Sequence, residues 1–142
     1  MWRLLSLFVL SLLLHAAVAS AQIAGGGLGG RLCTSKIAIN QTTGTTVITG
    51  SSGNKIYICS VVLVTAADQS ISLVEGTGTV CATSIAAVMG GTTASISLVA
   101  QGGLSAVAAF AWLFTATAAN NLCLLQSGVA NVSGVITYRS GP

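Results

Sequence analysis

The sequence predicts an all-β protein, an antiparallel β-sandwich or jelly roll of about seven to eight short strands behind a cleaved signal peptide. Three observations lead to this prediction. Short β-branched segments recur along the chain, turn formers such as Gly, Ser, Thr and Asn separate them at fairly regular spacing, and few segments favour a helix. Strands separated in this way are typical of sandwiches and jelly rolls.

Residues 1–21 have the three parts of a secretory signal peptide. Arg3 supplies a positive start, residues 4–18 form an apolar run, and residues 19–21 are an Ala-x-Ala processing site. An uncleaved membrane anchor is the alternative, but it needs about 20 apolar residues and this run is shorter. We therefore expect a mature protein that is secreted or extracytoplasmic, in the periplasm, at the cell surface or on a virion, and that has no membrane segment.

Residues 22–32 are rich in glycine and predict a flexible arm, because glycine backbone loses the most entropy when it is fixed. Their spacing matches a dinucleotide-binding fingerprint, but that motif needs a strand before it and a helix after it. We favour a linker. A single β-sandwich domain is expected over residues 33–142.

The first strands of this domain are predicted from β-branched segments. Residues 36–40 and 45–49 are two of them, and residues 50–54 are a loop of turn formers. Residues 55–65 are apolar on both faces in their second half. They therefore predict the central buried strand.

A hairpin is expected next. Residues 66–69 turn the chain into residues 70–74, where Ile71 and Leu73 face the core and the serines face solvent. The same five residues, Ser-Ile-Ser-Leu-Val, recur at 95–99. Two copies do not make a repeat protein, which needs about three units, so we interpret them as two equivalent strands.

The rest of the domain completes the series. Residues 76–81 predict a loop and residues 83–89 a helical turn. Residues 104–119 are ambiguous, because their alanines favour a helix while their aromatic residues and threonines favour a strand. We favour a strand there over the alternatives of a core helix or membrane insertion. The last three strands are expected at residues 110–116, 122–126 and 132–138.

All four cysteines, Cys33, Cys59, Cys81 and Cys123, lie in the exported part of the chain. An oxidising compartment makes two disulfides the expectation. A zinc site needs close pairs such as Cys-x-x-Cys, which this spacing lacks. Four cysteines allow three pairings. We favour Cys59–Cys81, which joins neighbouring segments, with Cys33–Cys123, which ties the arm to a late strand.

Groups able to move protons are scarce in this sequence. The only histidine, His15, lies in the leader, so the mature chain has no imidazole for catalysis or metal binding. The two acidic residues are predicted to be a turn residue, Asp68, and a solvated strand end, Glu75. A Ser–Lys pair would use Lys36 or Lys55, and no serine is marked out. We expect a protein that is not an enzyme and holds no cofactor or metal.

Charged residues make up only 5% of the chain, and the formal net charge is +3. Nucleic-acid binding takes more basic residues than this, so no nucleic-acid partner is expected. A typical soluble domain has about a quarter of its residues charged. Because a nearly neutral surface repels its copies weakly, we expect a homo-oligomer.

The aromatic residues lead to a second hypothesis. Phe110, Trp112 and Phe114 are spaced by two, so in a strand they share one face, and we favour a core layer over a ligand platform. In a binding module, the residues expected to stack on a ligand are Trp112, Tyr57 and Tyr138. Exposure of these residues favours that reading, and burial of all three opposes it.

Four segments carry a resemblance to known sequences: Tyr57–Ser60, Gly76–Cys81, Asn121–Leu124 and Val132–Tyr138. Together they resemble a group of small exported four-cysteine hypothetical proteins from bacterial, prophage and environmental phage-like genomes. The resemblance implies a compact β-rich domain that is associated with a virion or a cell surface. It implies no activity for any residue.

These observations support three hypotheses about function. The leading one is a secreted, non-catalytic structural or adhesive subunit of a virion, surface layer or filament, which associates with copies of itself. The second is a monomeric extracellular binding module for a neutral ligand such as carbohydrate. The third is a filament subunit in which residues 22–32 or 132–138 pair with a neighbour's open sheet edge.

Overall fold

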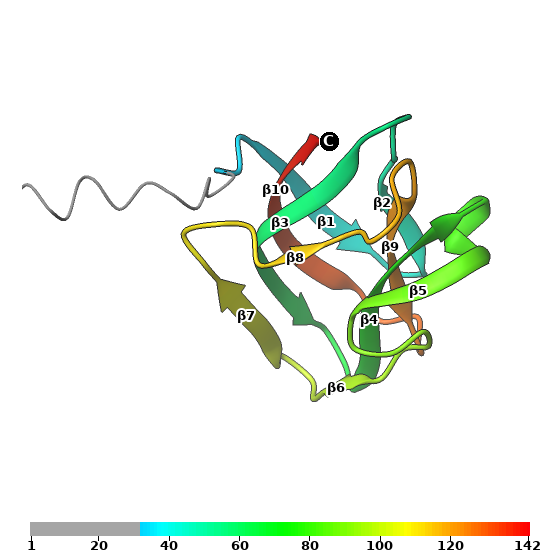
Figure 1. The fold of residues 1–142 in the computed structure, drawn as a ribbon. Helices are drawn as coiled ribbons and strands as arrows, with labels where there is room; N and C mark the ends of the chain where they lie inside the picture. The colour runs from blue at the N-terminus through cyan, green and yellow to red at the C-terminus, as the bar shows by residue number, and fades with distance from the viewer. Residues whose placement is uncertain (1–31) are drawn as a thin grey trace, which may run out of the picture. The chain divides into compact units, whose positions relative to one another are not determined.

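A computed structural model of the protein describes residues 32–142. They form ten β-strands in two antiparallel sheets that pack together, which confirms the predicted all-β sandwich (Figure 1). The predicted signal peptide, and all but the last residue of the predicted arm at 22–32, lie outside the described residues.

Sheet A contains five strands. From one edge to the other they are β1 (Ser35–Gln41), β10 (Val132–Gly141), β3 (Lys55–Thr65), and then β7 (Gly103–Val107) and β8 (Leu113–Phe114), which both pair with β3. Because β10 is paired with β1 on one side and β3 on the other, it has no free edge. Residues 132–138 therefore present no unpaired edge in the single chain, and their exchange with a neighbouring molecule stays a prediction.

Sheet B also contains five strands. They are β2 (Thr45–Ile48), β9 (Asn121–Gln126), β4 (Gln69–Thr77), and then β5 (Thr83–Met89) and β6 (Ile96–Leu98), which both pair with β4. A short 3-10 turn, η1 (Thr79–Cys81), connects β4 to β5.

The strand order is that of a jelly roll. β1 pairs with β10, β2 with β9, β3 with β7 and β4 with β5, so nested antiparallel pairs alternate between the two sheets. Consecutive strands β3 and β4 therefore lie in different sheets, and the hairpin predicted across residues 66–69 is wrong. Each of these strands has an apolar side that is buried when the two sheets face each other.

The corner between β3 and β4 is held by a buried glutamine. The side-chain amide of Gln69 donates hydrogen bonds to Thr65 Oγ1 at 2.6 Å and to the carbonyl oxygen of Ala130 at 2.9 Å. The corner is thereby fixed to the loop that leads into β10.

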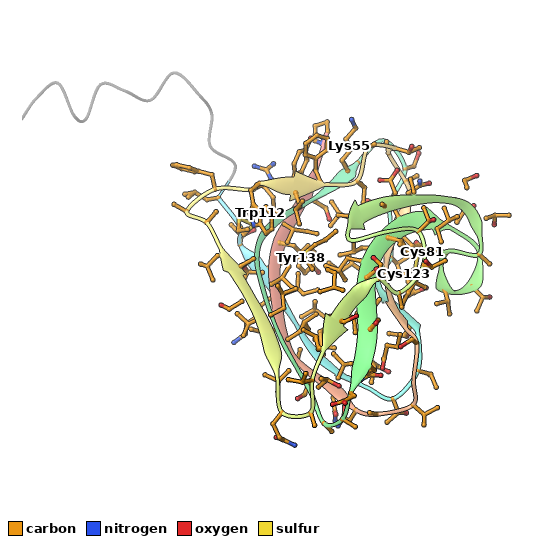
Figure 2. The ribbon with its side chains drawn as sticks, turned by 90° about the horizontal axis from the view of Figure 1, so that it is seen from below. Lys55, Cys81, Trp112, Cys123 and Tyr138 are labelled. Atoms are coloured by element: carbon orange, nitrogen blue, oxygen red, sulfur yellow. A yellow bond between two sulfur atoms is a disulfide. The ribbon has the colours of Figure 1, made fainter. Side chains whose placement is uncertain are left out.

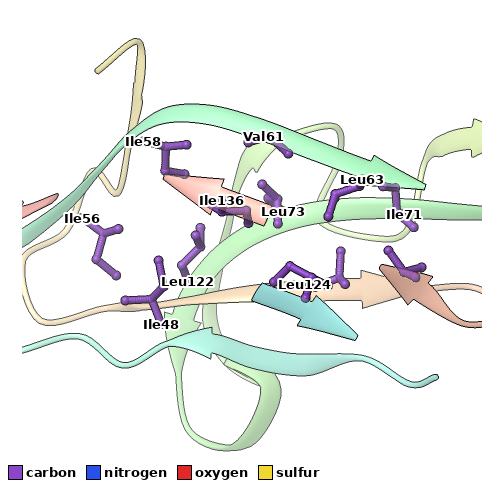
Figure 3. Packing of buried hydrophobic residues seen from close by; sticks show 12 residues of the cluster. Ile48, Ile56, Ile58, Val61, Leu63, Ile71, Leu73, Leu122, Leu124 and Ile136 are labelled. Carbon is purple, nitrogen blue, oxygen red and sulfur yellow. The ribbon is translucent and has the colours of Figure 1, made fainter. Parts of the chain in front are cut away.

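The core between the sheets is built from isoleucine, leucine and valine (Figure 3). Its fully buried members include Ile56, Ile58, Val61, Leu63, Ile71, Leu73, Leu122, Leu124, Val132 and Ile136. β3 faces this core along its whole length because its register with β10 shifts, so that Cys59 and Ser60 together separate Ile58 from Val61. Among the described residues, no aromatic side chain belongs to the fully buried core.

Two other predicted elements differ from the structure. Residues 83–89, expected as a helical turn, form β5, because the free side of β4 offers backbone partners. Residues 104–119 hold most of β7, a loop and β8, with no helix, and the predicted strand at 110–116 shortens to β8. β5 is the strand that was not predicted, and the segment 104–119, favoured as a strand, holds most of β7 as well as β8. No helix in the described part is long and apolar enough to span a membrane.

The two Ser-Ile-Ser-Leu-Val copies pair with each other. Ser70 lies opposite Ser97, and Ile71 opposite Ile96, in antiparallel register. The expectation that the serines face solvent is wrong for Ser72, which is buried. Its hydroxyl donates to the carbonyl oxygen of Thr93 at 2.7 Å and accepts from the backbone N–H of Ser95 at 3.0 Å. The loop before β6 is thereby held against sheet B.

Candidate functional site

Both disulfides lie outside the main core. Cys33–Cys59 ties the segment before β1 to β3, and Cys81–Cys123 ties η1 to β9. Two disulfides were predicted and are present, but the favoured pairing is wrong. The reason is that Cys59 belongs to sheet A while Cys81 covers the outer side of sheet B, so both sheets separate them. Two disulfides suggest an oxidising, extracytoplasmic environment.

The outer face of sheet B is covered by the chain itself. Val74 and Cys123 alternate with the core residues of β4 and β9, so they point outward. They are nevertheless fully buried, together with Cys81 of η1. Figure 2 shows Cys81 and Cys123 side by side, well away from Trp112. The disulfide therefore fixes η1 as a cover on this face.

The outer face of sheet A carries exposed apolar side chains instead. Val107 is 72% exposed, and Val64 and Phe114 are also exposed. We call this surface the open face. Its outward side chains, placed by the alternation of each strand about the core, include Lys36, Ala38, Lys55, Tyr57, Ser60, Val62, Val64, Ser105, Val107, Phe114, Val135, Thr137 and Arg139.

One end of the open face holds a row of aromatic and basic side chains. Phe114, Tyr57 and Arg139 lie opposite one another on three neighbouring strands, β8, β3 and β10. The rings of Tyr57 and Phe114 have centroids 6.1 Å apart and are tilted by 35°. Arg139 Cζ lies 6.0 Å from the centre of the Tyr57 ring, and Lys55 Nζ lies 5.8 Å from that of Phe114. We call these four residues the cation–aromatic row.

Trp112 lies beside this row and is held by two hydrogen bonds to β3. Its indole Nε1 donates to the carbonyl oxygen of Cys59 at 3.0 Å, and its backbone N–H donates to that of Ile58 at 3.0 Å. The side chain remains 42% exposed. The core layer predicted for Phe110, Trp112 and Phe114 is wrong, because Leu113 takes the inward position opposite Ile58 and all three aromatic residues are exposed.

The structure brings together two of the three residues predicted to stack on a ligand. Trp112 and Tyr57 both lie on the outer side of sheet A. Tyr138 does not, because it lies opposite Ile58 and packs against the core from the inner side. The sequence prediction missed Phe114, Lys55 and Arg139 as members of the site. The spacing of two between Lys55 and Tyr57 is a signal that they share a strand face.

The two acidic side chains lie away from the row, whereas the oxygen of Pro142 lies at it and accepts a hydrogen bond from the Tyr57 hydroxyl at 3.1 Å. Glu75 is 2% exposed, so the predicted solvated strand end is wrong. Its side chain accepts hydrogen bonds from the backbone N–H of Thr117 at 3.2 Å and from Asn120 Nδ2 at 3.4 Å, which pins the loop after β8. Asp68 lies in the β3–β4 corner, at the other end of β3 from Lys55, and accepts from the backbone N–H of Ala100 at 2.6 Å.

The open face therefore has a positive character at one end. Lys36, which is exposed on β1 opposite Thr137, adds a third cation to Lys55 and Arg139. Within residues 32–142, no group of three or more His, Cys, Asp or Glu side chains is placed to hold a metal ion.

Comparison with known proteins adds no identity to this description. No protein-family model, curated protein or solved structure matches the chain.

Proposed function

We propose that the protein is a secreted, non-catalytic structural or adhesive subunit that associates with copies of itself through the open face of sheet A. The observation that carries this proposal is the exposure of Val64, Val107 and Phe114 on one sheet face. These side chains are spread along β3 and its neighbours, and the partly exposed Val62 lies between Val64 and Val107. Exposed apolar side chains that share one sheet face are typical of interaction surfaces. With a formal net charge of only +3, the chain has little repulsion to keep its copies apart.

The charges along β3 favour a two-fold arrangement of two copies. Lys55 lies at the start of the strand, and Asp68 follows its end. If two open faces stack with their β3 strands antiparallel, the basic end of each copy lies over the acidic end of the other. The apolar side chains between these ends then lose contact with water, which contributes about 25 cal/mol per Å² of area buried.

The association state of the exported protein tests this proposal. We expect light scattering after size-exclusion chromatography to give multiples of the monomer mass for the wild type and for Val129→Asp, which places a charge in an exposed loop. The same charge in Val107→Asp lies on the open face and should yield monomers. A wild-type protein that stays monomeric at high concentration would sink the proposal.

Secretion is part of the same proposal and has its own measurement. The intact mass of the exported protein, taken without reduction, should correspond to residues 22–142 less four hydrogens. A mass that retains Met1 would contradict cleavage of the leader.

A monomeric binding module for a neutral ligand such as carbohydrate is the second candidate function. It is favoured by Trp112, whose ring is held by its own N–H and yet remains half exposed. Jelly rolls are used both in viral capsids and in lectins, so the fold is compatible with either candidate by analogy alone. Trp112→Ala should abolish binding to a neutral polysaccharide in affinity electrophoresis. Unchanged binding by this variant would show that the Trp112 ring does not take part in binding the polysaccharide.

A further inference from the structure

We propose that the cation–aromatic row binds an acidic polysaccharide, a linear sugar polymer that carries carboxylates. The proposal rests on the second candidate function and deepens it, because it replaces a neutral ligand by a charged class of sugar. It is carried by the geometry of Lys55, Tyr57, Phe114 and Arg139.

The two cations of the row are held in place by the rings beside them. Arg139 lies against Tyr57, and Lys55 lies against Phe114, at 6.0 and 5.8 Å from the ring centres. Such contacts contribute about 0.5–1 kcal/mol at exposed sites, so they restrict the two long side chains before a ligand arrives. Less conformational entropy is then lost on binding.

The charge of these cations is not neutralised by a carboxylate side chain of the chain. The sequence has only two acidic residues. Glu75 is buried and bonded to Thr117 and Asn120, while Asp68 lies at the far end of β3. The Pro142 oxygen is bonded to the Tyr57 hydroxyl at 3.1 Å, and neither acidic side chain reaches Lys55 or Arg139, so carboxylates of a ligand can pair with these two cations. A guanidinium offers a planar fork of N–H donors that matches a carboxylate, and an ammonium adds a second point of positive charge.

The spacing of the two cations favours a polymer over a small anion. Arg139 lies opposite Tyr57, and Lys55 lies opposite Gly141, so the two are diagonal neighbours on adjacent strands. Their charged ends lie over two different rings, those of Phe114 and Tyr57, whose centroids are 6.1 Å apart, so each cation offers a separate point of contact. The exposed rings of Phe114 and Trp112 lie beside them and offer apolar surface to sugar rings. A surface of this kind suits successive units of a chain.

Affinity measurements with the exported, disulfide-bonded protein test this inference. The probes are polygalacturonate, dextran as a neutral polysaccharide, and a single-stranded DNA oligonucleotide as another polyanion. We expect polygalacturonate to bind about tenfold or more tightly than either comparator, which is the effect of one charge-assisted hydrogen bond. Added salt should weaken this binding.

Variants separate a built site from general attraction. Arg139→Gln and Arg139→Lys should each weaken polygalacturonate binding about tenfold, since the lysine keeps the charge and loses the fork. Phe114→Ala should do the same by releasing Lys55. Lys36→Gln is the matched control, because it removes one charge from the same face where no ring contact holds it, and it should change affinity less than about twofold.

Each contrary outcome has its own meaning. Equal binding of DNA, or an equal loss with Lys36→Gln, would show general charge attraction and overturn the inference. Equal binding of dextran would overturn it while leaving the neutral-ligand function in place. If no polysaccharide binds, both fail, and light scattering on the same samples reports separately on self-association. Because Arg139 is half-buried, its substitution can disturb the fold. Only variants whose circular dichroism spectrum matches that of the wild type are therefore compared.

Discussion

The two outer faces of this sandwich are finished in opposite ways. On sheet B, η1 and the loop before β6 cover outward side chains of β4 and β9, and the Cys81–Cys123 disulfide fixes that cover, while Ile85 of β5 remains exposed. On sheet A, valines and aromatic side chains face outward in the open, with three cations beside them. A chain with 5% charged residues has few means of making a sheet face polar. The comparison teaches that such a chain either covers an apolar face with itself or leaves it for a partner.

The largest expected effects come from removing each disulfide. Loop-closure entropy predicts a loss of about 4 kcal/mol for Cys81→Ala with Cys123→Ala, and about 3.5 kcal/mol for Cys33→Ala with Cys59→Ala, from sequence separations of 42 and 26. The first pair also uncovers Val74. Urea unfolding measures the free energies, and dye binding reports newly exposed apolar surface. A larger loss on removal of Cys33–Cys59 than on removal of Cys81–Cys123 would mean that the second disulfide does not stabilise the cover on sheet B.

A smaller loss is expected where the cover approaches sheet B most closely. A Cβ at Gly76 would lie 2.8 Å from the carbonyl oxygen of Thr83 and 2.9 Å from Cys81 Cβ. Gly76→Ala should therefore lower the free energy of unfolding by about 2 kcal/mol through overpacking. Gly91→Ala is the control, since its Cβ would come no nearer than 3.2 Å to the movable Ser95 side chain. Equal losses in the two variants would argue against a close cover.

The serines of sheet B give a matched pair within one strand. Ser72→Ala removes the buried hydroxyl that bonds the carbonyl oxygen of Thr93 and the N–H of Ser95, although that N–H keeps its bond to the Ile71 carbonyl oxygen at 3.2 Å, so we expect a loss of about 1.5 kcal/mol. Ser70 bonds Ser97 near solvent, and water can replace that bond. Ser70→Ala should cost about 0.5 kcal/mol. Thermal unfolding of both variants measures the difference, and its absence would mean that the loop before β6 covers nothing.

The smallest effect on stability is expected on the open face. Val107→Ser should leave the free energy of unfolding within about 0.5 kcal/mol of the wild type, because the side chain is already exposed. The same variant should lower the mean mass in light scattering, since the open face loses apolar area. A stability loss above about 1 kcal/mol would mean that Val107 packs within its own chain.

Local pattern was enough to predict the fold class and most strands, because the β-branched residues of β3 and the alternation in β10 depend only on neighbouring residues. β5 was missed because its conformation follows from pairing with β4, which no local pattern reveals. The cysteine pairing failed for a related reason. Spacing along the chain does not tell which outer face each cysteine joins.

In the candidate site, too, some residues could be placed from local pattern and others only from strand pairing. Lys55 and Tyr57 share a face by simple alternation, so their proximity was available from sequence. Arg139 joins them only through the register of β10 on β3, which includes a bulge at Cys59 and Ser60. Trp112 and Phe114 were placed on the wrong side because a strand of two residues has no pattern that distinguishes its faces.

The pairing of β1 with β10 has a consequence for the order of folding. The first strand of the domain must wait for the last, so sheet A is completed only after nearly the whole chain is free to fold. Cys33 and Cys59 both emerge early, and their disulfide crosses from the segment before β1 to β3. β10 lies between these two strands. Once formed, the disulfide keeps β1 near β3. β10 then meets both of its partner strands in one place, which should speed its pairing.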